Sequence, residues 1–403
     1  MGMNDTPSGE RVHVGFFGLR NAGKSSVVNA VTGQKLSLVS AVRGTTTDPV
    51  KKAMEILPLG PVVVIDTPGI DDEGELGEMR VQRALDTLSE TDVAVLVADG
   101  TRGMTEGDRT LEGAFQKKGI PYVIAWNKSD LLADPPAASE NLIPVSALTG
   151  EGIRDLRERI AALGTKKTAG EKRIAADLLE PGDTAVLVIP IDAAAPKGRL
   201  ILPQQQTIRD LLEGGCSALC CRDTELAGTL NALAAPPKLV ITDSQAFGRV
   251  SKIVPDSVPL TSFSILFARY KGDLDELVKG AAALKNLRDG DPVLISEGCT
   301  HHRQCGDIGT EKLPRWIREY TEADPAFSFT SGGEFPRDPS AYRLVVHCGG
   351  CMLNEREMKS RIEACREAGI PVVNYGVAIA QIHGILARSL GPFPETLRLL
   401  EER

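Results

Sequence analysis

Gly18-Leu19-Arg20-Asn21-Ala22-Gly23-Lys24-Ser25 is the stretch that decides the fold of the N-terminal half. It has the pattern G-x-x-x-x-G-K-S, follows a short apolar run at 12–17 and precedes a helical pattern through Val27, Val28 and Val31. The glycines let backbone N–H groups face phosphates, Lys24 reaches the β- and γ-phosphates, and Ser25 ligates Mg2+. The order strand, loop, helix predicts a nucleotide-binding loop, whose contacts also include Asn21, Ala22, Gly23 and Ser26.

A hairpin is expected after this loop. Two strand-like runs at 51–57 and 62–66 flank the turn sequence Pro58-Leu59-Gly60-Pro61. The second run ends in Asp66-Thr67-Pro68-Gly69, where Asp66 can hold the Mg2+ hydration shell and the Gly69 amide can sense the γ-phosphate. We therefore predict Lys24, Asp66 and Gly69 as catalytic residues.

Strands and helices alternate further along the first half. The apolar runs 93–98 and 121–126 are separated by a helical stretch at 106–118, which predicts an α/β fold with a mainly parallel sheet covered on both faces. Asn127-Lys128-Ser129-Asp130 and Ser146-Ala147 each follow a strand. The Asp130 carboxylate can accept the N1–H and 2-amino group of guanine, which adenine does not offer. We therefore expect GTP as the nucleotide, with Lys128 along the base and Asn127 tying the loops together.

The composition favours neither a membrane nor a nucleic-acid partner. The chain has 403 residues, a formal charge of −8, and no apolar run near the ~20 residues that span a bilayer. The acidic balance offers no broad basic surface for a phosphate backbone. We therefore expect a cytoplasmic protein. The length fits two or three domains, and we expect a GTPase domain at 10–165 and two further α/β domains at 175–265 and 266–403.

A polar linker at 164–170 is expected to end the first domain. Beyond it, strands are predicted at 184–190, 199–203 and 238–242, and helices at 205–212 and 223–233. The apolar strands of this middle unit suit either a self-association surface or an ordinary interior sheet. Its cysteines are interpreted as small buried residues rather than ligands: Cys216, Cys220 and Cys221.

All eight cysteines lie in the second half, and in the cytosol they would stay reduced. A strand predicted at 342–346 runs into His347-Cys348-Gly349-Gly350-Cys351, with a helix predicted at 354–367. The C-x-x-C turn places two sulfurs on one loop, and Cys299, His301 and Cys305 lie upstream. Thiolates and imidazoles grouped in this way hold zinc or an iron–sulfur cluster, and the spacing leaves both open.

The motifs of the first half resemble those of the translation-factor-like GTPases, and more closely the branch that contains Era and the tRNA-modifying GTPase. The resemblance implies that Asn21 ligates K+, although a turn residue explains it equally well. The segment 44–48 resembles switch I of that branch, so Thr46, or Thr45 in its place, would bind Mg2+ and the γ-phosphate. The resemblance thus adds Thr46 to the predicted catalytic residues. Ile70 stands where Ras-type enzymes carry a glutamine that positions water, so slow, potassium-stimulated hydrolysis is expected. One acidic side chain of the next segment could polarise the water, although a solvated loop explains them better: Glu73, Glu75 and Glu78.

Over essentially the whole chain the sequence resembles the [FeFe]-hydrogenase maturation GTPases. The shared features are C-x-H at 299–301, a spacer of about forty-five residues and the H-C-x-x-C motif behind a GTPase domain, together with the runs 195–200 and 202–207. The resemblance implies a homodimer formed by the middle domain and a [4Fe-4S] cluster bound by Cys299, Cys348 and Cys351. It also implies a scaffold that works with radical-SAM maturases, receives a transient two-iron subcluster precursor and delivers it to apo-[FeFe]-hydrogenase.

Three cysteines leave one iron of a four-iron cluster without a thiolate, which suits a carrier because an incoming group can attach there. Cys305 competes for the fourth position, and His301 and His347 are placed near the site as ligands or hydrogen-bonding neighbours. GTP is expected to act by changing the conformation of the switch loops. The alternatives are an RNA- or ribosome-associated GTPase with a zinc-stabilised C-terminal module, and a GTP-dependent metal sensor without a client enzyme.

Overall fold

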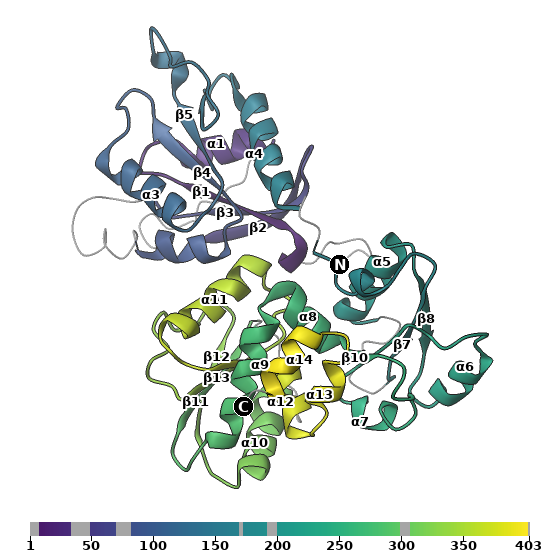
Figure 1. Ribbon diagram of the computed structural model, residues 1–403. Helices are drawn as coiled ribbons and strands as arrows, with labels where there is room; N and C mark the ends of the chain where they lie inside the picture. Colours follow the sequence, from purple (N-terminus) through teal and green to yellow (C-terminus); the bar gives the residue numbers. More distant parts are fainter. Residues whose placement is uncertain are drawn as a thin grey trace. The chain divides into compact units, whose positions relative to one another are not determined.

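The computed structural model describes residues 8–33, 49–69, 82–168, 172–191, 200–298 and 307–401, and Figure 1 shows its elements. The chain divides into two compact units, Met1–Glu171 and Lys172–Arg403. The first contains one β-sheet and the second contains two. Among the residues described, no helix combines the length and the apolar character needed to cross a membrane.

A six-stranded sheet in the order β2-β3-β1-β4-β5-β6 forms the first unit. Its strands are β1 (Val12–Phe17), β2 (Val50–Ile56), β3 (Gly60–Asp66), β4 (Val93–Asp99), β5 (Tyr122–Asn127) and β6 (Leu142–Pro144). All neighbours run parallel except β2, which pairs antiparallel with β3 and forms the predicted hairpin.

Helices cover both faces of this sheet, as predicted, and Figure 1 shows them on either side of it. They are α1 (Lys24–Thr32), α3 (Glu106–Lys117) and α4 (Ile153–Thr168). Val27 of α1 and Leu156 of α4 are buried in one core, whereas Leu111 and Phe115 of α3 are buried in another. The two separate cores are the two faces of a sheet that is apolar on both sides.

The predicted linker at 164–170 is wrong for its first five residues, because α4 continues through Thr168. Gly164 does not end the helix. A Cβ atom at this position would lie 2.8 Å from Cδ1 of Leu59, so the missing side chain lets α4 pack closely against the β2–β3 turn. Such packing offsets the cost of glycine in a helix, which is about 1 kcal/mol relative to alanine.

The second unit holds two four-stranded sheets, both entirely parallel, in the orders β10-β9-β7-β8 and β12-β11-β13-β14. The strands of the first are β7 (Thr184–Val188), β8 (Ser217–Cys221), β9 (Leu239–Thr242) and β10 (Leu260–Ser262). Those of the second are β11 (Pro292–Glu297), β12 (Ala326–Ser331), β13 (Leu344–His347) and β14 (Val372–Asn374). The helices are α5 (Leu202–Glu213), α6 (Leu226–Ala232), α7 (Phe247–Val250), α8 (Phe263–Lys271), α9 (Leu274–Ala283), α10 (Leu313–Thr321), α11 (Glu355–Glu367), α12 (Tyr375–Ile382), α13 (Leu386–Ser389) and α14 (Pro394–Glu401).

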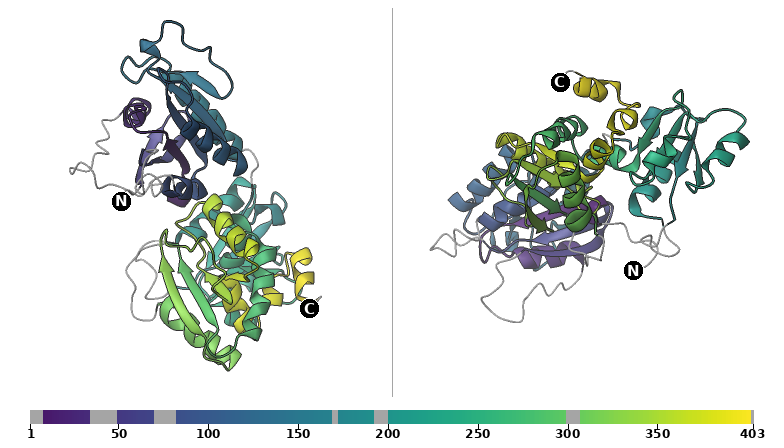
Figure 2. Two further views of the ribbon diagram at one scale, coloured as in Figure 1. Left: turned by 90° about the vertical axis from the view of Figure 1, so that its left-hand side faces the viewer. Right: turned by 90° about the horizontal axis from the view of Figure 1, so that it is seen from below.

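One hydrophobic core joins the two sheets of this unit. Leu187 of β7, Phe263 of α8 and Val293 of β11 are buried in the same cluster. The segments that follow residue 260, coloured green to yellow, lie together in both views of Figure 2. A domain boundary at 265/266 would fall within α8, a helix that contributes to this shared core.

The strand predicted at 199–203 is wrong, because α5 begins at Leu202 and residues 200 and 201 are not extended into a strand. Pro203 stands in the first turn of the helix, where its missing N–H is not needed. The Gln204 side chain accepts a hydrogen bond from the Ile201 N–H at 3.1 Å. These are features of a helix start, and they outweigh the short apolar run that suggested a strand.

Candidate functional site

The nucleotide motifs meet at the carboxyl edge of the first sheet. The predicted phosphate loop links β1 to α1, and Asn21 and Gly23 have φ angles of 65° and 86°. Ala22 is buried within the loop, whereas Ser25 and Ser26 on α1 are exposed. A turn of this kind before a helix N-terminus directs backbone N–H groups toward an anion.

The side chains of Lys24 and Ser25, at the start of α1, lie close to Asp66 at the end of β3. The Lys24 Nζ is 4.0 Å from Asp66 Oδ1, and the Ser25 hydroxyl is 3.5 Å from Asp66 Oδ2. Burial raises the pKa of Asp66, against the opposing effects of Lys24 and Ser25. Asp66 Oδ1 is buried without a hydrogen-bond partner within the described part of the chain. Hydroxyl and carboxylate oxygens are the donors that Mg2+ prefers, so this group fits a magnesium ion.

The segment after Asp66 returns to the phosphate loop. The Thr67 hydroxyl donates to the Phe16 carbonyl oxygen at 2.8 Å, and Gly69 lies against the backbone of Arg20. The remaining predicted switch residues fall outside the described ranges, so their roles stay predictions: Thr45, Thr46, Ile70, Glu73, Glu75 and Glu78.

Asn127 joins the phosphate loop to the predicted base-binding loops. Its Nδ2 donates to the Ala22 carbonyl oxygen at 2.8 Å, and its Oδ1 accepts the Ala147 N–H at 3.1 Å. Ser146 is fully buried, and its hydroxyl accepts the Thr149 N–H at 3.1 Å. Asp130 follows on a short helical turn (Ser129–Leu131) with its carboxylate exposed. The structure therefore brings the residues predicted for guanine recognition to one edge.

Asp99, the last residue of β4, belongs to this site and was missed from the sequence. The Lys128 Nζ lies 2.5 Å from Asp99 Oδ2. Burial alone would raise the pKa of Asp99, but hydrogen bonds from Lys128 and Thr101 lower it. The available signal was an acidic residue at the end of an apolar run. In the structure Asp99 pairs in register with Asn127, the last residue of β5.

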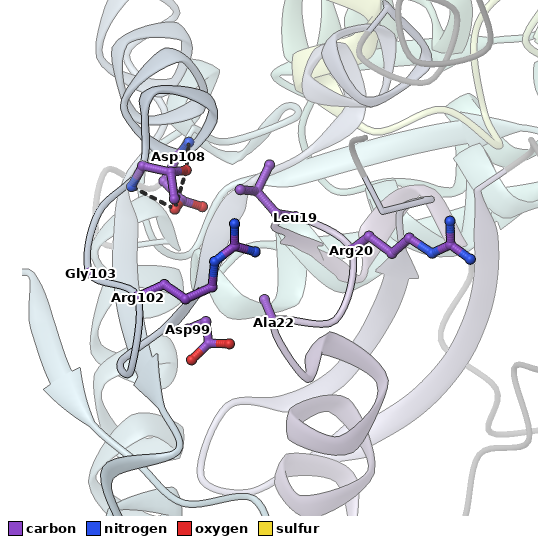
Figure 3. Close-up of a pocket in the computed structure, with 8 residues that line it drawn as sticks. Leu19, Arg20, Ala22, Asp99, Arg102, Gly103 and Asp108 are labelled. Carbon is purple, nitrogen blue, oxygen red and sulfur yellow. Dashed lines mark hydrogen bonds between the residues drawn. The ribbon is translucent and has the colours of Figure 1, made fainter. Parts of the chain in front are cut away.

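A small pocket lies between the loop after β4 and the phosphate loop. Figure 3 shows Asp99, Arg102 and Gly103 on one side, with Leu19 and Ala22 on the other. Asp108 lines the same pocket from the start of α3, where its carboxylate accepts hydrogen bonds from the Thr105 N–H and hydroxyl at 3.1 and 2.8 Å. The loop after β4 is thus fixed to α3 beside the nucleotide motifs.

The cysteine motif lies at the carboxyl edge of the third sheet. β13 ends at His347, and Cys348 and Cys351 occupy the loop before α11. The Cys348 Sγ accepts the Gly298 N–H at 3.0 Å and the Gly350 N–H at 3.4 Å. Two N–H donors directed at one sulfur favour the thiolate, which is the form that binds metals.

The rest of the predicted ligand set lies outside the residues that the structure describes: Cys299, His301 and Cys305. Within the described ranges, no group of three or more His, Cys, Asp or Glu side chains is placed to hold a metal ion. The donor chemistry of Cys348 and Cys351 fits an iron–sulfur cluster or zinc. His347 is buried, with Nδ1 2.7 Å from the Cys348 carbonyl oxygen and Nε2 2.9 Å from Arg361 Nη1.

Glu297 and Tyr375 adjoin this loop and were not predicted. The Tyr375 hydroxyl donates to Glu297 Oε1 at 3.3 Å. Burial, followed by the negative charges of Glu297 and Cys348, raises the pKa of Tyr375, so the phenol stays protonated. A buried carboxylate at the end of β11 therefore has a neutral hydrogen-bond donor beside it.

The middle cysteines differ from one another. Cys216 is buried as predicted, but Cys220 is exposed and Cys221 is half-buried. The prediction of a buried residue is wrong for Cys220 and only partly met for Cys221, because β8 is an edge strand whose residues are largely uncovered.

Family models match most of the chain. Residues 174–272 match the hydrogen maturase F dimerization domain, and residues 275–392 match the hydrogen maturase F tetramerization domain. Residues 13–128 match the family described as 50S ribosome-binding GTPase. The first unit is therefore a GTPase domain.

Curated relatives match the GTPase part. The tRNA modification GTPase MnmE of Nitrosomonas europaea is 34% identical over 166 residues, which are 40% of this chain and 35% of that protein. The GTPase Der of Kosmotoga olearia is 31% identical over 176 residues, covering 39% of this chain and 40% of that protein. This chain thus spans well under half the length of either relative.

Among solved structures, a probable GTP-binding protein engB is 25% identical, covering 38% of this chain and all of that chain, with a TM-score of 0.32.

The two hydrogen maturase F models together span more than half of the 403 residues and follow a GTPase domain in sequence. The chain therefore belongs to the hydrogen maturase F family.

Proposed function

We propose that this protein is a GTP-hydrolysing scaffold that binds a [4Fe-4S] cluster and assembles or delivers the two-iron subcluster to apo-[FeFe]-hydrogenase. The observation that carries the proposal is the loop at Cys348, whose sulfur accepts two backbone N–H groups in a unit matched by both hydrogen maturase F models. Radical-SAM maturases would supply the two-iron precursor. The protein would act in the cytoplasm as a homodimer formed through residues 174–272.

The nucleotide site supports hydrolysis of GTP to GDP and phosphate. Lys24 would neutralise the β- and γ-phosphates, Ser25 and Thr46 would ligate Mg2+, and Asp66 would hold the metal's water shell. Asp130 would select guanine. Asn21, which adopts a left-handed conformation in the loop, would ligate K+ and make hydrolysis potassium-dependent.

The cluster would be held by Cys299, Cys348 and Cys351, which leaves one iron with an exchangeable ligand. Such an iron offers a position for an incoming group, and this property distinguishes a carrier from a closed structural site. GTP would act on partner affinity. A coupling free energy of about 1 to 3 kcal/mol changes affinity roughly 5- to 150-fold. Equal affinities for the hydrogenase in the GTP- and GDP-bound forms would contradict this coupling.

Anaerobic reconstitution with iron and sulfide tests the cluster. Visible absorption and EPR should show a [4Fe-4S] signal that is lost in Cys299→Ser, Cys348→Ser and Cys351→Ser. Cys220→Ser is the matched control, because that cysteine is exposed on β8 in a separate sheet. Lys24→Ala should abolish GTP hydrolysis and leave the cluster signal intact, because Lys24 belongs to the other unit.

A second candidate follows from the match of residues 13–128 to a family described as ribosome-binding. In that case the C-terminal cysteines would hold structural zinc, and the protein would bind RNA or ribosomes. Tight, stoichiometric zinc without an iron chromophore would favour this function over the scaffold.

A further inference from the structure

Two buried cations hold the two ends of the cysteine loop, defined here as residues 347–353. Arg361 of α11 contacts the N-terminal end, and Lys271 of α8 contacts the C-terminal end. They are 5% and 2% exposed, although arginine and lysine are rarely buried without partners. Lys271 bonds to two carbonyl oxygens of the loop, and Arg361 bonds to His347 of the loop and to Gly332 and Glu357.

Arg361 fixes the ring of His347. Its Nη1 is 2.9 Å from His347 Nε2, and its Nη2 donates to the Gly332 carbonyl oxygen at 2.7 Å and to Glu357. A guanidinium group only donates hydrogen bonds, so Nε2 must be the acceptor. The proton of the neutral ring is then on Nδ1, where it donates to the Cys348 carbonyl oxygen at 2.7 Å.

Phe335 closes this arrangement from one side. Its ring centroid lies 6.1 Å from that of His347 and 5.2 Å from the Arg361 guanidinium carbon. Both ring nitrogens of His347 are thus engaged in protein hydrogen bonds, in surroundings that keep the ring and the guanidinium together. For His347 to ligate iron, one of these hydrogen bonds would have to break.

Lys271 acts on the other end of the loop. Its Nζ donates to the carbonyl oxygens of Cys351 at 3.3 Å and Leu353 at 3.2 Å. These two bonds orient the peptide groups at Cys351 and Leu353, and they place a positive charge against the main chain of Cys351. Lys271 is the last residue of α8, within the region matched by the dimerization domain, whereas the loop is matched by the tetramerization domain.

We propose that Arg361 and Lys271 are positioning residues that fix the loop 347–353 for metal binding, and that Arg361 keeps His347 off the iron. His347 then serves as a brace for the Cys348 carbonyl group, and the exchangeable position of the cluster is left to another ligand. This inference rests on the proposed cluster-binding function, although the loop geometry it describes exists without a metal. A cluster with three thiolates is negatively charged, so Lys271 would also favour its reduction.

Hydrogen exchange of the apo protein tests the loop geometry without any metal. Arg361→Met and Lys271→Met should each accelerate exchange of the amides at 348–353 about tenfold or more. Arg361→Met loses the hydrogen bond that holds His347, and Lys271→Met loses the two hydrogen bonds to the carbonyl oxygens of Cys351 and Leu353. Arg366→Met and Lys279→Met are matched controls on exposed positions of α11 and α9. Where Arg361→Met does not fold, Arg361→Lys replaces it, since one ammonium cannot reach both His347 and Gly332. Unchanged exchange in the Arg361 and Lys271 variants overturns the proposal.

Spectroscopy of the reconstituted protein tests the two specific roles. The nitrogen hyperfine coupling of the reduced cluster in histidine-labelled protein should be the same in wild type and His347→Gln. Its disappearance in His347→Gln would make His347 a ligand and overturn that assignment. Lys271→Met should lower the cluster's midpoint potential, Lys271→Arg should restore it, and an unchanged potential in Lys271→Met would refute the electrostatic role. If wild-type protein takes up no iron–sulfur cluster, the proposed function fails, whereas the exchange experiment still decides the loop geometry.

Discussion

Replacing Gly350 with alanine tests whether the cysteine loop depends on a backbone conformation suited to glycine. Gly350 has a φ angle of 62°, and a Cβ atom there would lie 2.4 Å from Sδ and 2.9 Å from Cγ of Met358. The Gly350 N–H donates to Cys348 Sγ at 3.4 Å. A shift of this residue would therefore move a hydrogen-bond donor away from a predicted cluster ligand.

Two costs add in Gly350→Ala. The left-handed backbone costs a residue with a side chain about 1 to 2 kcal/mol. Met358 is buried in the unit, so displacing it adds an overpacking cost of about 1 to 3 kcal/mol. The sum of about 2 to 5 kcal/mol should lower the Tm of a unit of this size by roughly 4 to 20 °C.

Gly349→Ala is the matched control, because a Cβ atom at Gly349 meets no atom of the described residues within 4 Å. Thermal unfolding by circular dichroism should separate the two variants, and hydrogen exchange of 348–353 should be faster in Gly350→Ala alone. After reconstitution, Gly350→Ala should also lose iron to a chelator faster than Gly349→Ala. Equal Tm values and equal loop exchange in the two variants would refute the reasoning.

Three further outcomes follow from the described contacts. Asn127→Ala should raise the Kd for GDP roughly 5- to 150-fold, since two hydrogen bonds of about 0.5 to 1.5 kcal/mol each are lost. Asn141→Ala, at an exposed position, is the control and should leave the Kd unchanged. An unchanged Kd for Asn127→Ala in a fluorescent-nucleotide titration would contradict this prediction. The pKa of Asp99 is lowered in the folded protein, so its contribution to stability is present above the unfolded pKa of about 3.9 and is lost as pH falls through the folded pKa. In urea titrations Asp99→Asn should therefore be less stable than wild type near neutral pH. The difference in unfolding free energy between the two proteins should disappear in acid. Leu219 lies on the edge strand β8 and is 37% exposed, so Leu219→Lys adds a charge to that edge and should convert a dimer to a monomer. Sedimentation velocity measures the change, with Leu57→Lys in the other unit as the control. A dimer that persists in Leu219→Lys places the interface elsewhere.

The nucleotide site was predictable because its signals are local. A strand, a glycine-containing loop and a helix N-terminus lie within the same twenty residues, and their geometry follows from chain direction and turn chemistry. Asn127 is expected to tie the loops together, and in the structure it makes hydrogen bonds to Ala22 and Ala147. Asp99 was missed because its partner Lys128 lies 29 residues further along the chain, directly after the neighbouring strand β5.

The supports of the cysteine loop were not predictable in the same way. Lys271 lies 80 residues before Cys351, and no local pattern connects them. Arg361 offered a partial signal, since it shares the buried face of α11 with Met358, Ile362 and Cys365. A charge on such a face requires a partner. The sequence alone does not show that the partner is His347.

The two errors in secondary structure have local causes that a propensity argument undervalued. Gly164 suggests a boundary, but a glycine inside a helix also permits close packing, here against Leu59. The apolar run before Gln204 suggests a strand, but proline in a first turn is a stronger indication of a helix. Only the Gly164 contact depends on a residue far away in the sequence, whereas the proline signal is local.

The contacts of Lys271 connect the cysteine loop to the core of the second unit. α8 begins at Phe263 directly after β10, is buried in the core shared by both sheets, and ends at the residue that holds Cys351 and Leu353. Packed helices move as bodies rather than deforming continuously. A change at the middle sheet, such as dimer formation, can therefore reach the loop through one helix. If GTP acts on the cluster as proposed, a displacement of α8 or α11 is one way in which the nucleotide would change how the cysteines are presented.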